Sequence, residues 1–293
     1  KDQKIFKNKD NIEWPNFILT VLISLSILVP MFIAPTTTNQ YLNSAYDLIA
    51  SNIGGAYLIM GLLTLIFLLL LAFSKYGKIR LGNDHEKPEY GTFGWSSMLF
   101  CCGIGASLVL YGSTEWVDYY LRPPFDAIPG SKEAISWASS YGMFHWGITG
   151  WAIYCFPAVA IGYNYHVRGA TSLKASTGCE AIFDNSENSL FAKLIDLIYM
   201  IALVGVLGAG LGLTSPVVSA TITEFFVIEQ SLIVTISCLL LCLVIYSIST
   251  YFGLEKGIQK LSKFCAYLAF IVLIYILIFG PTSYIINSSI QSI

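Results

Sequence analysis

Apolar residues dominate seven stretches of the chain, and a polar interval separates each stretch from the next. Each stretch is long enough to cross the hydrocarbon core of a bilayer, which takes about 20 residues in a helix. Inside hydrocarbon every backbone N–H and C=O must be paired within its own segment, so stretches of this length are predicted to be helices. We therefore predict an all-α integral membrane protein with spans at 17–34, 53–74, 92–117, 135–167, 197–223, 231–251 and 264–286.

The composition excludes an ordinary water-soluble domain. Hydrophobic residues make up 55% of the chain, charged residues only 12%, and the mean hydropathy is +0.67, whereas soluble domains carry about a quarter charged residues. No basic tract is present that would suit nucleic acid. Six of the seven cysteines lie in or beside apolar runs without metal-ligand spacing, so they are predicted to be packing residues and no metal site is expected.

Lysine and arginine are strongly segregated along the sequence. Of the 16 such residues, all but Arg122 and Lys132 fall in the N-terminal tail or in the intervals 75–91, 168–193 and 256–263. Cytoplasmic loops retain positive charge during membrane insertion. This distribution predicts a multi-pass protein of the cell inner membrane or plasma membrane, with its N-terminus in the cytoplasm.

The third span contains a run of small residues in the segment FCCGIGASLVLYGSTEW. Two interpretations of Gly103, Gly105, Ala106 and Ser107 remain open. Small residues let helices pack closely. Alternatively, the span is locally unwound there, and its freed backbone groups bind a substrate or a cation.

The fourth span reads FHWGITGWAIY and places three aromatic residues deep within an apolar run, where an interfacial belt does not explain them. Rings such as those of Trp146, Trp151 and Tyr154 either pack in the core or attract a cation to their faces. Trimethylammonium groups are commonly held in such aromatic cages. We expect His145 to pack in the bundle or to bond a backbone carbonyl, because no second metal ligand is spaced to help it.

Three acidic residues remain to be placed. Glu115 and Asp118, near the outer end of the third span, are either solvated residues at a mouth or functional charges inside the bundle. Asp196, which enters the fifth span, is predicted to be a helix-start or interfacial residue.

Taken together, these motifs resemble the betaine/choline/carnitine transporter family. The similarity runs from about residue 14 to residue 284 and rests on MLFCCGIG, YGSTEW with the following PPF, FHWGITGWAIY, GLGLTSP and GLEKGIQKLS. The resemblance implies the inverted-repeat transporter fold shared with amino-acid symporters. It divides the chain into a cytoplasmic tail (1–16), two leading helices with a cytoplasmic loop (17–91) and the first five-helix repeat (92–293). The chain is expected to be a fragment without a secretory leader, and the second repeat is absent from it.

The resemblance also implies roles for individual residues. The fourth-span pattern forms much of an aromatic box around the substrate ammonium in that family, which assigns Trp146, Trp151 and Tyr154 to the box. The glycine-rich part of the third span resembles the unwound segment that binds substrate and cation, which assigns Gly103, Ile104, Gly105, Ala106 and Ser107 to the substrate site.

Four positions depart from the family pattern in ways that bear on coupling and substrate. Leu203 and Leu207 stand where sodium-coupled relatives have threonines, and Cys265 stands where carnitine exchangers have an arginine that replaces a cation. Asp118 stands where the exchangers have an aromatic residue, which suggests a more cationic substrate such as choline. No cofactor is expected, and sodium coupling is left open.

The function that follows is secondary transport of a small quaternary-ammonium or onium osmolyte, such as glycine betaine, carnitine or choline, by alternating access. No nucleotide-binding signature is present. The alternatives are a transporter of another amine or amino acid, an osmolyte sensor, or an intramembrane enzyme, of which the last lacks paired catalytic groups. The expected partners are the substrate and the lipid bilayer, with a homotrimer left open as the assembly.

Overall fold

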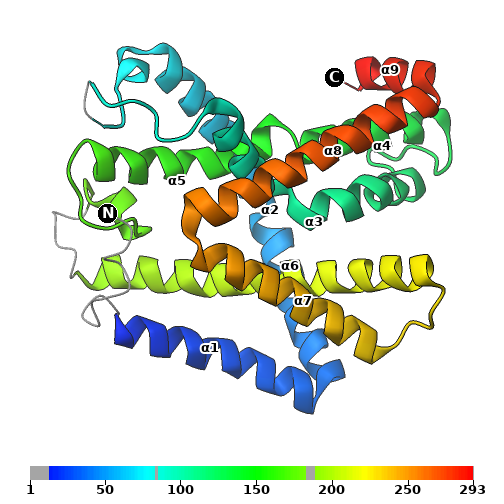
Figure 1. Cartoon of the computed structure of the whole chain (residues 1–293), viewed down its shortest axis with the longest axis horizontal. Helices are drawn as coiled ribbons and strands as arrows, with labels where there is room; N and C mark the ends of the chain where they lie inside the picture. Colours follow the sequence, from blue (N-terminus) through cyan, green and yellow to red (C-terminus); the bar gives the residue numbers. More distant parts are fainter. Residues whose placement is uncertain (1–12, 83–84, 183–188, 293) are drawn as a thin grey trace. The chain divides into compact units, whose positions relative to one another are not determined.

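The computed structural model describes residues 13–82, 85–182 and 189–292, with only the backbone described for 103–109 and 255–256. Every regular element in these ranges is helical, which confirms the predicted all-α class (Figure 1). The α-helices are α1 (Trp14–Ile33), α2 (Pro35–Phe73), α3 (Thr92–Leu121), α4 (Lys132–His145), α5 (Ile148–His166), α6 (Leu190–Phe226), α7 (Leu232–Tyr251), α8 (Gln259–Phe279) and α9 (Thr282–Gln291). Short helical turns lie at η3 (Lys75–Lys78), η4 (Ser176–Cys179) and η5 (Leu254–Ile258).

The helices fall into two compact units. One unit contains α1, α2, α5 and the first part of α6, as far as Val206. Within it α2 packs against α5, and a Cβ added at Gly61 would make ordinary van der Waals contact with the side chains of Thr149 and Ile153. The T-shaped ring pair of Phe67 and Phe156, with centroids 5.6 Å apart, continues this contact.

The other unit contains α3, α4, α7, α8, α9 and the rest of α6. Helix α3 is its centre, because it packs against both α4 and α8 (Figure 1). Helix α9 follows α8 and contacts both α8 and α4, where the hydroxyls of Ser139 and Ser288 lie 3.5 Å apart.

Buried and exposed residues are distributed in the opposite way to a soluble protein. In the described part of the chain, the buried apolar side chains are all small: Ala134, Ala138, Ala152, Ala192, Cys238 and Ala266. Leucine, isoleucine, valine and phenylalanine side chains instead cover the outside of the helices. Lipid tails solvate such side chains, so helices in a bilayer associate through small residues that allow close contact. The pattern is that of a membrane bundle.

Six described helical segments are long and apolar enough to cross a membrane, and they coincide with six of the seven predicted spans. They are Trp14–Ile33, Pro35–Phe73, Lys132–His166, Leu190–Phe226, Leu232–Tyr251 and Gln259–Phe279. The remaining predicted span, 92–117, lies within α3, and the side chains at its middle are outside the described residues.

The interval 35–52, expected to be a loop between the first two spans, is helical instead. Only Ala34 separates α1 from α2, and its backbone (φ −139°, ψ 66°) lies outside the α-helical region, which a following proline disfavours. Pro35 stands in the first turn of α2, where its missing N–H is not needed. No further proline follows within α2, so the helix continues through the polar residues for 39 residues, about 58 Å.

Two other predicted spans are interrupted. The fourth, 135–167, breaks between α4 and α5 at Trp146 and Gly147. A Cβ at Gly147 would lie 2.3 Å from the Met143 carbonyl oxygen, so only glycine fits this turn. The seventh, 264–286, breaks at Gly280 and Pro281, because proline cannot continue the hydrogen bonding of α8.

Because contact depends on small residues, enlarging one should destabilise the fold. Ala134 of α4 is fully buried, and Ala134→Leu is expected to lower the free energy of unfolding by about 1–3 kcal/mol. The measurement is thermal unfolding of the detergent-solubilised full-length protein. The control is Ile135→Leu, at an exposed neighbouring position. Equal unfolding temperatures for the two variants would contradict the packing described for α4.

Candidate substrate-binding site

Glu115 of α3 is the centre of a polar cluster at the end of α4. The Trp146 indole Nε1 donates to its Oε2 at 2.6 Å, and the Tyr119 hydroxyl donates to its Oε1 at 3.2 Å. The His145 Nδ1 lies 2.7 Å from the same Oε1. An ionised carboxylate only accepts hydrogen bonds, so all three groups donate to Glu115 and the histidine proton is on Nδ1.

This cluster fixes the orientation of the Trp146 ring. The Glu115 side chain is only 12% exposed, so its charge is withdrawn from solvent and depends on these three donors. Trp146 lies at the break that ends α4, where a side chain would otherwise be free to turn. Its ring also lies 6.0 Å from that of Tyr111, with the two planes 33° apart. The indole is thus held at its edge by a charge and beside another ring.

The structure decides between the two roles left open for Glu115. It is an enclosed charge with specific partners, not a solvated residue at a mouth. The expectation for His145 is wrong in one respect, because its ring bonds a carboxylate and not a backbone carbonyl. No group of three or more metal-ligating side chains occurs among the described residues.

The partners of Glu115 are residues that the sequence did not single out as a set. Tyr111, Glu115 and Tyr119 are spaced four apart, which places them on one face of α3. That spacing is the feature of the sequence from which a shared face of α3 could have been predicted. The contact with Trp146, 31 residues away in sequence, depends on how α3 packs against α4 and carries no local signal.

Helix α5 carries the other two residues predicted for the aromatic box. Trp151 and Tyr154 are three residues apart, and their ring centroids lie 6.3 Å apart with planes at 48°. Trp151 is half-buried, whereas Tyr154 is 68% exposed. The structure brings these two rings together within their unit, and it brings Trp146 together with Glu115 and Tyr111 within the other.

The remaining predicted site residues lie on α3. Asp118 is exposed, and its backbone carbonyl accepts the hydrogen bond that ends the helix. Only the backbone is described for residues 103–109, which leaves the side chains of Ile104, Ala106 and Ser107 outside the described part of the chain, and Gly103 and Gly105 are placed by their backbone alone. The backbone here belongs to the continuous helix α3, and so differs from the unwound segment that the resemblance implies.

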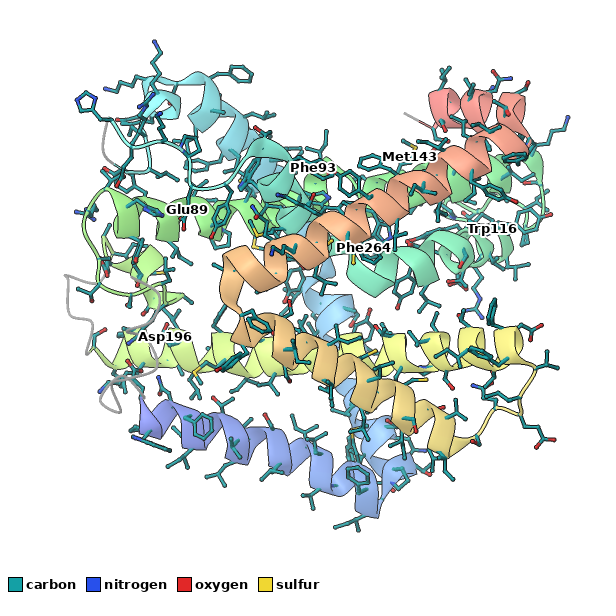
Figure 2. All side chains as sticks on the ribbon, viewed as in Figure 1. Glu89, Phe93, Trp116, Met143, Asp196 and Phe264 are labelled. Atoms are coloured by element: carbon teal, nitrogen blue, oxygen red, sulfur yellow. The ribbon has the colours of Figure 1, made fainter. Side chains whose placement is uncertain are left out.

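Asp196 does not stand at the start of its helix, which was one of the two roles expected for it. It is buried and lies beyond the first turn of α6, which begins at Leu190 (Figure 2). Its carboxylate accepts hydrogen bonds from the Ser176 backbone N–H at 2.9 Å and from the Ser176 hydroxyl at 2.8 Å. Asp196 therefore ties the loop after α5 to α6 and is not a helix-start residue.

The same region contains a pocket and an ion pair. The pocket, of about 330 Å³, is lined by Glu13, Phe17, Lys174, Ala175, Asp196, Tyr199 and Met200. Lys174 pairs with Glu13 just before α1. These contacts attach the loop after α5 to the start of α1 as well as to α6.

Helices with apolar exteriors, small-residue contacts and an enclosed carboxylate beside aromatic rings define a polytopic α-helical membrane protein. The chain belongs to the BCCT family, the betaine/carnitine/choline family transporters, whose family model matches residues 15–293.

Several relatives are transporters by name. The chain is 34% identical over 235 residues to a carnitine transporter of Acinetobacter baumannii, which is 80% of this chain and 42% of the relative. It is 33% identical over 277 residues to the glycine betaine transporter OpuD of Bacillus subtilis, 94% of this chain and 54% of the relative. It is 32% identical over 275 residues to the osmo-independent choline transporter BetT1 of Acinetobacter baylyi, which is 92% of this chain and 51% of the relative. The chain therefore spans about half the length of these relatives.

Removing the central carboxylate should cost stability. Glu115→Ala leaves the part-buried indole N–H of Trp146 without its acceptor, which costs about 1 kcal/mol. The matched control is Asp118→Ala, an exposed carboxylate on the same helix. Thermal unfolding of the full-length protein in detergent should show a clear decrease for Glu115→Ala alone. Equal decreases for both variants would contradict the distinction between an enclosed and a free carboxylate.

Proposed function

We propose that the protein to which this chain belongs transports a small quaternary-ammonium osmolyte across the cytoplasmic membrane by alternating access. The observation that carries the proposal is the Trp146 indole, fixed at its edge by the largely enclosed Glu115 carboxylate. The names of the relatives, which include carnitine, glycine betaine and choline transporters, support the same substrate class.

The proposed binding mode is a cage of aromatic faces. A trimethylammonium group has no N–H to donate, so it is recognised by cation–π attraction to the rings of Trp, Tyr or Phe. On the family resemblance alone, we assign the cage to Trp146, Trp151 and Tyr154. The hydrogen bond from the Trp146 N–H to a carboxylate adds electron density to the indole, which strengthens the attraction of its face for a cation.

Glu115 acts through Trp146 in this proposal. All three hydrogen bonds to its carboxylate come from protein groups, so it is a positioning residue for the indole. Its negative charge, shielded from solvent, also lowers the electrostatic cost of a cation nearby.

The coupling ion is a separate part of the proposal. Leu203 and Leu207 of α6 are both exposed aliphatic side chains. Hard cations take oxygen ligands, so these positions supply none, and we propose that no sodium ion binds there. An ion or substrate gradient remains the source of energy, and no covalent chemistry is involved.

The proposed orientation places the N-terminus in the cytoplasm. It is supported by the lysines and arginines, nearly all of which fall in the tail and in alternate intervals between the spans. The assembly proposed for the whole protein is a homotrimer, which rests on the family resemblance alone.

Transport by the full-length protein in proteoliposomes is the direct test. Uptake of radiolabelled glycine betaine, carnitine or choline is expected, whereas glycine, which lacks the methyl groups, should not compete. Uptake with and without a sodium gradient then measures whether sodium drives transport. Absence of uptake for all three substrates, with a gradient or in exchange mode, would refute the proposed function.

The cage is tested by removing its rings. A desolvated cation–π contact contributes about 2 kcal/mol, so Trp146→Ala or Trp151→Ala should raise the substrate Kd by about 30-fold. Isothermal titration on the purified full-length protein measures this change.

Trp116→Leu is the control for the cage variants. Trp116 is an exposed tryptophan of α3 whose indole donates to the Ser113 carbonyl (Figure 2). Its replacement should leave Kd unchanged. Equal losses from Trp116→Leu and Trp146→Ala would mean that the binding defect is not specific to the cage.

Asp118 is proposed to bias selection toward a substrate with net positive charge. Choline carries one net positive charge, whereas glycine betaine carries a carboxylate of its own, which a fixed aspartate repels. Asp118→Asn should therefore shift the ratio of choline to glycine betaine affinity toward betaine. Competition binding measures the ratio, and an unchanged ratio would remove Asp118 from the site.

A further inference from the structure

Helices α3 and α8 make a close contact that ends in a pair of cysteines. On α3 the contact involves Gly94, where an added Cβ would lie 2.5 Å from the Gln259 side chain of α8. One turn further along α3, Ser97 is buried. On α8 the buried residues are Ser262 and Ala266, again one turn apart. Small residues three apart on α3 and four apart on α8 lie on one face of each helix and bring the two backbones near each other.

Cys101 is the next position on this face of α3, four residues after Ser97. Its sulfur lies 3.6 Å from the carbonyl oxygen of Ser262. Cys265 follows Ser262 by three residues on α8 and so occupies the same side of that helix. Cys265 is also near enough to act electrostatically on the Cys101 thiol.

The two thiols differ in access. Cys101 is partly enclosed between the helices, whereas Cys265 is exposed. Cys102 is also exposed, but it points about 100° away from Cys101 around α3, as successive residues of a helix do. Only Cys101 combines contact with α8 and proximity to a second thiol.

We propose that Cys101 and Cys265 form a site of reversible oxidation, whose disulfide joins α3 to α8. The oxidant is a peroxide. The exposed Cys265 thiol attacks the peroxide O–O bond and becomes a sulfenic acid, with release of one water. The Cys101 thiol then displaces the hydroxyl of the sulfenic acid, which forms the S–S bond and releases a second water. Two thiols and one hydrogen peroxide thus give one disulfide and two waters, and a dithiol reductant reverses the reaction.

The bond would constrain the unit that contains Glu115 and Trp146. Helix α3 carries Glu115, and α8 is one of its two main packing partners. A covalent link between α3 and α8 prevents the two helices from sliding or separating. If alternating access requires such movement, as the proposed function implies, oxidation stops transport while leaving the substrate-binding residues unaltered.

The first experiment tests the bond itself and does not depend on transport. In the full-length protein every cysteine except Cys101 and Cys265 is replaced by serine, which within this chain means Cys102→Ser, Cys155→Ser, Cys179→Ser, Cys238→Ser and Cys242→Ser. The protein is treated with hydrogen peroxide, and its free thiols are counted by labelling with a polyethylene-glycol maleimide. Loss of both labels, with recovery after dithiothreitol, is expected.

The matched control retains Cys102 and Cys265 and carries Cys101→Ser. This pair should keep both labels under the same treatment, because its thiols are on different sides of the α3–α8 contact. Labels that persist in the Cys101 and Cys265 protein, equal oxidation of the control pair, or a disulfide that links two copies of the chain would each overturn the proposal.

A second measurement separates this proposal from the proposed function. If the reduced two-cysteine protein transports substrate, peroxide should abolish uptake and dithiothreitol should restore it, while Kd for the substrate stays the same. Uptake that continues after complete disulfide formation would overturn the constraint on transport. Absence of uptake from the reduced protein would count against the proposed function and not against the disulfide, which the label count tests alone.

Discussion

Close contact between helices through small side chains is the constraint on which the structure depends. Helix α2 meets α5 at Gly61, Gly94 permits the close contact of α3 with α8, and Ala134 and Ala266 are buried. Lipid offers leucine and phenylalanine an environment as apolar as a protein core, so burying them adds little, whereas van der Waals contact between backbones adds much. The positions most sensitive to substitution are therefore alanines, glycines and serines.

The cluster around Glu115 shows how a costly group can be accommodated in such a bundle. A carboxylate withdrawn from water is destabilising unless its oxygens are fully hydrogen-bonded. Here an indole, a phenol and an imidazole each donate to it, and each is then restricted in its own orientation. The rigidity needed to present an aromatic face to a ligand arises from satisfying a charge.

Features that depend on residues close together in sequence were predicted well, and features that depend on residues far apart in sequence were not. The helical spans depend on local hydropathy, and they were predicted closely. The helix at 35–52 was not, because its polar residues resemble a loop and only the absence of an interior proline favours a helix. The break at Trp146 and Gly147 was not predicted, because the apolar residues on both sides of it gave one continuous apolar stretch. The residues of the aromatic box were selected by their type and by family resemblance, but the partner that orients Trp146 was not, since Glu115 reaches it only after α3 and α4 pack together.

The length of α2 has a mechanical consequence. The hydrocarbon core is about 30 Å thick, so roughly half of this helix extends past it into water or head groups. A flexible loop there could move without shifting the embedded part, whereas a continuous helix moves with that part as one rigid element. Force applied at its polar tip, by an antibody or by crowding at the membrane surface, is transmitted to α5 through the contact at Gly61.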